Sequence, residues 1–159
     1  MSDHSIAFTL NGAARADDVP ANLMLADFLR ERCGLTGARI GCARGVCGAC
    51  TVLLDGDPRA ACSVFAFQIG GREITTIEGL GGGGALDPVQ QAFVANAAFQ
   101  CGYCTPGMIL LTKALLARNA SPSRAEIIEW LSSNVCRCTG YAQIIAAVED
   151  AAARMKACA

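Results

Sequence analysis

Histidine, net charge and long apolar runs are scarce in this sequence, and each shortage excludes a class of protein. His4 is the only histidine among the 159 residues, whereas a Rieske iron–sulfur centre needs two histidine ligands. We therefore expect no chemical role for His4. The formal net charge of -1 gives no electrostatic basis for binding nucleic acid or an anionic membrane surface. No stretch approaches the roughly 18 uninterrupted apolar residues of a membrane-spanning helix, so no membrane insertion is expected.

The first residues also lack the features of an export signal. Met1 to His4 contain no cationic stretch followed by an apolar run, so we predict a cytoplasmic protein, with export alongside a partner left open. Cysteine, by contrast, is abundant at ten residues. In a reducing compartment so many thiols indicate metal ligation rather than disulfides, and closely spaced cysteine pairs suit ligands around one centre.

Four cysteines form a first set with iron–sulfur spacing. They are Cys42, Cys47, Cys50 and, after 11 intervening residues, Cys62. One tight three-cysteine loop with a distant fourth cysteine is typical of plant-type [2Fe–2S] ferredoxins, whereas zinc sites use paired knuckles. Gly41, Gly45 and Gly48 permit the unusual φ values of a cluster-wrapping loop, so backbone N–H groups can approach the sulfurs. We expect these groups and Arg44 to stabilise a reduced cluster.

A second set of four cysteines lies in the C-terminal half. It consists of Cys101, Cys104, Cys136 and Cys138, with 31 residues between the two pairs. We expect the pairs to meet because each lies at helix ends of an antiparallel bundle. The positive end of the helix beginning at Pro106 should lower the pKa of Cys104. Spacing alone leaves open both an iron–sulfur cluster and a four-thiolate zinc site for this set.

Hydrophobic patterning and turn signals predict an α+β unit over residues 1–78. Alternating apolar residues and the turn signals Asn11-Gly12 and Asp55-Gly56 are typical of half-buried strands joined by hairpins. Strands are expected at 6–10, 13–19, 51–54 and 73–77, with a short helix over 25–34. The glycine-rich stretch 79–86 then predicts a flexible linker and a domain boundary.

Capping signals predict four helices over residues 87–159. Asp87-Pro88 and Thr105-Pro106 each place an N-cap before a proline at the first helical position. Ser123 with Glu126 forms a capping box that opens a third helix, and a fourth is expected over 141–156. The helix over 106–118 is apolar nearly all round, so it should be the central, buried helix of a compact bundle.

Three stretches of the sequence resemble the small iron–sulfur subunit of the xanthine oxidase, or molybdenum hydroxylase, family. They are 41–50 (GCARGVCGAC), 100–108 (QCGYCTPGM) and 136–141 (CRCTGY). The resemblance spans residues 5–153 and departs from the family at no cysteine position. It implies a β-grasp, plant-ferredoxin-like domain followed by a four-helix bundle-like domain, each holding a [2Fe–2S] cluster through its own four cysteines.

The resemblance further implies a place in a larger oxidoreductase, whose substrate site lies on another chain. Electrons would pass from a molybdopterin-type molybdenum cofactor on a large subunit through both clusters to FAD on a medium subunit, in a heterotrimer with or without further dimerisation. Gln100 matches the family position that hydrogen-bonds the pterin, and Cys138 matches a cluster ligand close to it. Apart from the resemblance, Gln100 would be interpreted as a solvated or helix-capping residue.

Other functions remain compatible with the sequence. One is a stand-alone ferredoxin-type electron carrier with an added helical module, and another is a structural protein with one cluster and one zinc ion. Within the family, the enzyme can hydroxylate heteroaromatic rings or aldehydes, oxidise carbon monoxide, or reductively dehydroxylate an aromatic acyl thioester, because substrate choice lies in the molybdenum subunit. Cys33 is expected to be a buried structural thiol and Cys158 a free one.

Overall fold

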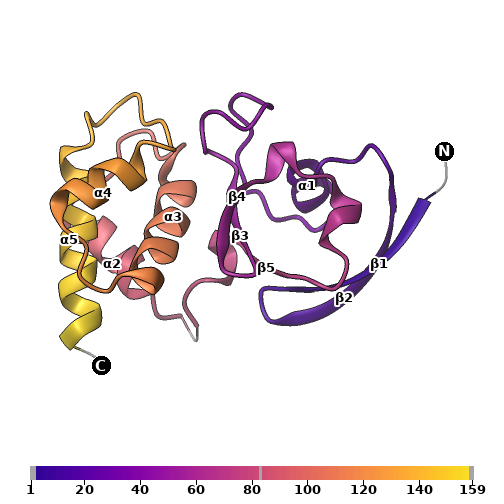
Figure 1. The fold of residues 1–159 in the computed structure, drawn as a ribbon, viewed down its shortest axis with the longest axis horizontal. Coiled ribbons are helices and arrows are strands. Elements are labelled where there is room, and N and C mark those ends of the chain that lie inside the picture. Colours follow the sequence, from indigo (N-terminus) through magenta and orange to yellow (C-terminus); the bar gives the residue numbers. More distant parts are fainter. Residues whose placement is uncertain (1–2, 83, 158–159) are drawn as a thin grey trace.

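The computed structural model describes residues 3–82 and 84–157 and has the predicted α+β class. The predicted linker residue Gly83 and the predicted free thiol Cys158 lie outside the described residues. Figure 1 shows a sheet with short helices, formed by the N-terminal half, beside a group of helices formed by the C-terminal half. The two halves have separate hydrophobic cores, and a small third cluster lies between them.

Five strands form one mixed sheet in the order β2-β1-β5-β3-β4. They are β1 (Asp3–Leu10), β2 (Ala13–Pro20), β3 (Thr51–Leu54), β4 (Asp57–Ala60) and β5 (Glu73–Thr75). β1 pairs with β5 in parallel, and the other neighbours are antiparallel. Both predicted hairpin turns are present, since Asn11 and Gly12, like Asp55 and Gly56, have positive φ as type I′ turns require.

β4 was not predicted from the sequence, and β5 is shorter than the strand predicted over 73–77. β4 begins Asp57-Pro58-Arg59 and has no apolar alternation. It is an edge strand, which is where a sheet tolerates proline. β5 ends at Thr75, and the chain then turns into the 3-10 helix η4 (Ile77–Gly79). Both errors arise from short strands that carry too few residues to show a period.

The predicted short helix is present but changes type along its length. α1 (Leu25–Asp27) continues as the π-helix η1 (Phe28–Arg32). Leu25, Phe28 and Leu29 are fully buried beneath the sheet because spacings of three and four residues put them on one face. Cys33, expected to be buried, is half-exposed just after η1, although it packs against the N-terminal core.

Four α-helices lie within residues 84–157 of the described structure, as predicted. They are α2 (Pro88–Ala95), α3 (Thr105–Arg118), α4 (Arg124–Leu131) and α5 (Ala142–Ala157). Capping boxes at Asp87 and Ser123 open α2 and α4. Cys104, not Thr105, is the N-cap of α3 and makes no side-chain cap, so that predicted cap is wrong. α3 is buried over most of its surface, which confirms it as the central helix.

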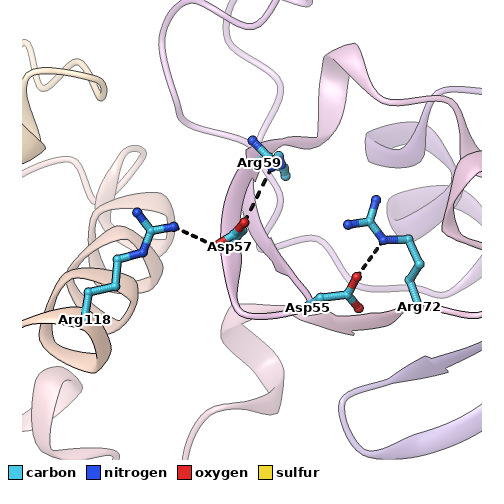
Figure 2. A network of polar contacts seen from close by, with 5 residues as sticks. All are labelled: Asp55, Asp57, Arg59, Arg72 and Arg118. Atoms are coloured by element: carbon cyan, nitrogen blue, oxygen red, sulfur yellow. Dashed lines mark hydrogen bonds and ion pairs between the residues drawn. The ribbon is translucent and has the colours of Figure 1, made fainter.

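The two halves meet where α3 packs against β3 and β4. Leu53 of β3 forms a small apolar cluster with Leu110 and Ala114 of α3. Beside this cluster, Arg118 of α3 reaches across to Asp57 of β4 at 2.6 Å (Figure 2). The junction is therefore apolar inside and ion-paired at its edge. No helix in the described ranges has the length and hydrophobicity needed to cross a membrane.

Figure 2 also shows how the β3–β4 turn is held to its own half. Arg72 pairs with Asp55 at 2.7 Å, and Arg59 approaches Asp57 at 3.6 Å. These ion pairs are about half-exposed, so solvent screens them and they contribute little to stability. After β4 the chain continues directly into the 3-10 helix that carries Cys62.

Candidate iron–sulfur centres

The first cysteine set lies on and beside the loop that leads into β3. Cys42 and Cys47 are half-buried on this loop, and Cys50 is buried just before the strand. The β3–β4 hairpin then returns the chain, so that Cys62, buried in η2 (Ala61–Ser63), lies against the same loop. The structure therefore places all four members of the set in one loop region, where Cys42 interacts with Cys47 and Cys50 with Cys62.

Backbone N–H groups are directed at the sulfurs of this first set. The bonds are Gly45 N to Cys62 Sγ (3.2 Å), Val46 N and Cys47 N to Cys42 Sγ (3.3 and 3.4 Å), and Cys62 N to Cys50 Sγ (3.4 Å). The loop can present these donors because Ala43 and Gly45 have positive φ, 55° and 75°. Donors fixed in this way stabilise negative charge on thiolates and on a cluster bound to them.

The cysteines of the first set differ in acidity. Hydrogen bonds from the backbone of Arg44, Cys47 and Val46 lower the pKa of Cys42 to about 6. Burial raises the pKa of Cys50 to about 12. The thiolate form of Cys42 is thus favoured near neutral pH, whereas metal binding must displace the proton of Cys50. Arg44 lowers the pKa of Cys42 through its main chain; its predicted effect on a reduced cluster stays a prediction.

The second cysteine set gathers where the C-terminal helices end. The Sγ atoms of Cys101 and Cys138 lie 3.5 Å apart, and both residues are exposed. Cys136 is buried and Cys104 half-buried, and their side chains interact. The predicted meeting of the two pairs is present: each member of the first pair has a partner in the second.

The acidity of Cys104 overturns one prediction. Burial raises the pKa of Cys104 to about 12, with a further rise from Cys136. The positive end of α3 does not compensate, because the Cys104 side chain packs against the core of the helices and desolvation outweighs the dipole. Burial raises the pKa of Cys136, but hydrogen bonds with Thr139, Cys138 and Cys104 together outweigh burial and leave this pKa lowered.

The two exposed cysteines of the second set have opposite shifts. The backbone N–H of Tyr103, which lies 3.5 Å from Cys101 Sγ, lowers the pKa of Cys101. The hydrogen bond with Cys101 raises the pKa of Cys138. Cys101 is therefore favoured as a thiolate, and Cys138 donates a hydrogen bond to it. A bound metal would replace the shared proton.

The sulfurs form pairs rather than a tight group around one point. Across residues 3–82 and 84–157, no three side chains of the ligand types Cys, His, Asp and Glu are gathered as if to hold one metal ion. A four-thiolate zinc site requires four sulfurs about 2.3 Å from a single ion. Two pairs of thiols would also fit a [2Fe–2S] cluster, which would take two thiolates at each of its irons.

Hydrogen bonds connect the loops of the two sets directly. Val135 N, next to Cys136, donates to the carbonyl of Cys47 at 2.9 Å. Tyr103 Oη donates to the carbonyl of Ile40 at 2.9 Å. Arg39 donates to the carbonyl of Gly102. The two candidate centres are therefore held next to each other by contacts that join segments far apart in the sequence.

Several residues of this arrangement were missed in the sequence. Asn134 is buried between the halves and hydrogen-bonds Thr51. Tyr141 bonds to the backbone of Cys136 and Asn134. Their adjacency to the cysteines was visible, but nothing in their spacing showed which segments they would join. Gln100, by contrast, was singled out, and it lies exposed immediately before Cys101.

Family models match most of the chain. A model described as "[2Fe-2S] binding domain" matches residues 76–149. Another, described as "2Fe-2S iron-sulfur cluster binding domain", matches residues 35–96. Together these ranges contain all eight cysteines of the two sets.

Curated relatives resemble the chain over nearly its full length. The nicotinate dehydrogenase small FeS subunit of Eubacterium barkeri is 47% identical, with 97% of this chain and 98% of that protein covered. The nicotine 6-hydroxylase small subunit of Paenarthrobacter nicotinovorans is 49% identical, with 89% and 86% covered.

Solved structures show the same fold. A chain of quinoline 2-oxidoreductase from Pseudomonas putida superposes with a TM-score of 0.94 at 44% identity, covering 99% of this chain and 98% of that one. The aldehyde oxidoreductase of Desulfovibrio desulfuricans gives a TM-score of 0.93 at 42% identity, with 99% of this chain and 17% of that one covered. The fold thus occurs both as a chain of this length and as a small part of a much longer chain.

Proposed function

The chain belongs to the family of small iron–sulfur subunits of xanthine dehydrogenase-type molybdenum hydroxylases, and from that membership we propose that it carries electrons through two [2Fe–2S] clusters. The partners are a large subunit with a molybdopterin-type molybdenum cofactor and a medium subunit with FAD. The reaction itself takes place on the large subunit. Each cluster, when bound, supplies one-electron transfer, and this chain holds the clusters and connects them.

The observation that carries the proposal is the pairing of thiols in two sets beside each other. We assign Cys42, Cys47, Cys50 and Cys62 to one cluster and Cys101, Cys104, Cys136 and Cys138 to the other. The first belongs to a ferredoxin-like β-grasp domain over 1–78 and the second to a helical domain over 87–159, with 79–86 as the linker. The N–H donors at the first set and Thr139 at the second would offset the negative charge of reduced clusters.

Apolar side chains around the cysteines support the presence of partner subunits. Val46, Phe99, Tyr103 and Val135 each lie within two residues of a proposed ligand and are 41–63% exposed. Exposed apolar groups gathered in one region mark interaction surfaces. We place the partner subunits over these loops, where they would exclude water from the electron path.

An apolar groove of about 320 Å³ lies beside the second set. Leu86, Val94 and Phe99 line it, and it reaches Gly102 between two cysteines. Thr105 Oγ1 also lines this region and has no hydrogen-bond partner within the described residues. We assign this groove to the large subunit, because Phe99, which lines it, directly precedes Gln100 in the chain.

Gln100 is the residue that we propose contacts the pterin of the molybdenum cofactor. It is exposed and directly precedes Cys101. Its amide offers both a donor and an acceptor, which suits a pterin edge. We expect the complex in the cytoplasm, where thiol ligands remain reduced.

Isolation of the native complex tests this proposal. Affinity purification through this chain, from the cells that produce it, should yield two larger chains, molybdenum and flavin in stoichiometric amounts. A stable monomer without either cofactor would instead identify a stand-alone electron carrier.

A further inference from the structure

We propose that Thr51, Asn134 and Tyr141 form a hydrogen-bonded bridge that sets the position of one cluster relative to the other. The Thr51–Asn134–Tyr141 bridge joins the backbone of the first cysteine loop to the backbone of Cys136. These three are positioning residues, since none of them is a proposed ligand. The inference rests on the proposed function in one respect: both cysteine sets must hold clusters.

The bridge can be followed atom by atom. The Cys136 N–H donates to Tyr141 Oη at 2.9 Å, and Tyr141 Oη donates to the Asn134 carbonyl at 3.0 Å. The Asn134 side-chain amide donates to Thr51 Oγ1 at 3.3 Å, and Thr51 Oγ1 donates to the Gly48 carbonyl at 2.7 Å. Gly48 lies between two proposed ligands of the first cluster, so the bridge runs from one centre to the other.

Burial makes this bridge specific. Asn134 and Thr51 are 4% and 5% exposed. An unsatisfied polar group at such depth costs about 1–3 kcal/mol, so the two side chains can be buried only when the halves dock in this one register. Any sliding of the helical half against β3 would break the bond between Asn134 and Thr51.

The surrounding backbone is shaped to receive Asn134. A Cβ added to Gly48 would overlap the Asn134 side chain, and a Cβ added to Gly107 would overlap the Gly48 carbonyl. Two glycines from different halves thus create the space that the amide fills. Tight packing around a satisfied polar group fixes distance as well as orientation.

Tyr141 is held in a costly conformation at its end of the bridge. Its φ is 67°, in the left-handed region that bulky residues rarely adopt. The backbone around it persists because the Tyr141 hydroxyl both accepts from Cys136 and donates to Asn134. This backbone conformation places the Tyr141 side chain where its hydroxyl can bond to the backbone of the second cysteine set.

The test is the magnetic interaction between the two clusters in the purified native complex. After reduction with sodium dithionite, two neighbouring clusters would split each other's EPR signals, by an amount that falls steeply with the distance between them. We expect Thr51→Val and Asn134→Leu to retain the iron content of the wild type but lose part of this splitting. Thr51→Ser, which keeps the hydroxyl, should retain the wild-type splitting.

A matched control separates position from stability. Thr112 is also a fully buried threonine whose hydroxyl donates to a backbone carbonyl, that of Met108 at 2.8 Å, but it lies within α3. Thr112→Val should remove a similar bond and leave the splitting unchanged. Wild-type splitting in both bridge variants, or an equal loss in Thr112→Val, would overturn the inference.

Two further outcomes are decisive. If the bridge variants bind less iron, Tyr141→Phe, which removes only one hydroxyl, takes their place: reduced splitting supports the bridge, and unchanged splitting refutes it. If the wild-type complex itself contains one cluster and one zinc ion, the proposed function fails, and the inference fails with it.

Discussion

Replacing Gly107 with alanine tests how closely the two halves of the molecule approach each other. Gly107 lies in the first turn of α3, with no positive φ, so its backbone is one that alanine adopts readily. In a solvated helix this change stabilises a protein by about 1 kcal/mol. Here the added methyl group would overlap the carbonyl oxygen of Gly48 in the first cysteine loop. The structure therefore predicts a change of opposite sign.

The magnitude follows from these two terms. Overpacking a well-packed site costs about 1–3 kcal/mol, and the obstructing atom is a backbone oxygen that cannot rotate away. After subtracting the helix preference of about 1 kcal/mol, we expect a net loss of up to about 2 kcal/mol. For a protein of this size that corresponds to a fall in the melting temperature of about 4–8 °C.

The assay is the thermal midpoint of the iron-loaded protein, followed by far-ultraviolet circular dichroism. Gly48→Ala and Gly12→Ala calibrate it, because both glycines have positive φ, 67° and 80°. Gly12 has open space around it, whereas Gly48 faces Asn134. Each alanine variant should lose about 1–2 kcal/mol of stability through backbone strain. Gly48→Ala should be destabilised more than Gly12→Ala, because its methyl group would also overlap Asn134. A raised midpoint for Gly107→Ala, or equal losses for Gly48→Ala and Gly12→Ala, would refute the close approach.

Three other substitutions give distinct results. Cys62→Ala should remove about half of the iron, whereas Cys33→Ala should leave the iron content unchanged; equal losses would refute the ligand assignment. Gln100→Ala should slow reduction of the clusters by substrate while both stay assembled, and unchanged rates at equal molybdenum content would refute its role. Hydrogen bonds from Ser123 lower the pKa of Glu126 below its usual 4.5, so its stabilisation should be lost as the pH falls below that value. The stabilities of wild type and Glu126→Gln should therefore differ at neutral pH and converge as the pH falls through the lowered pKa of Glu126.

Much of this architecture could be predicted because the signals were local. The turns at Asn11-Gly12 and Asp55-Gly56 and the caps at Asp87 and Ser123 act within four residues, and all are present. The buried helix α3 was visible in its all-round apolar sequence. The α+β class followed from these elements.

The remaining features depend on contacts between distant segments. The raised pKa of Cys104 results from burial against other helices, which the helix dipole argument ignored. Asn134 and Thr51 are 83 residues apart, and no periodicity links them. The edge strand β4 lacks the apolar alternation of a half-buried strand. The cysteine spacing was informative because [2Fe–2S] ligand sets have characteristic spacings. The register between the two halves of the molecule leaves no such pattern in the sequence.

The central claim is that this chain holds two [2Fe–2S] clusters. Iron, zinc and acid-labile sulfide should be measured per chain on protein purified without oxygen. The account predicts about four irons and about four sulfides without zinc. About two irons with one zinc would contradict it, because the helical half would then hold a structural metal and could not pass electrons on.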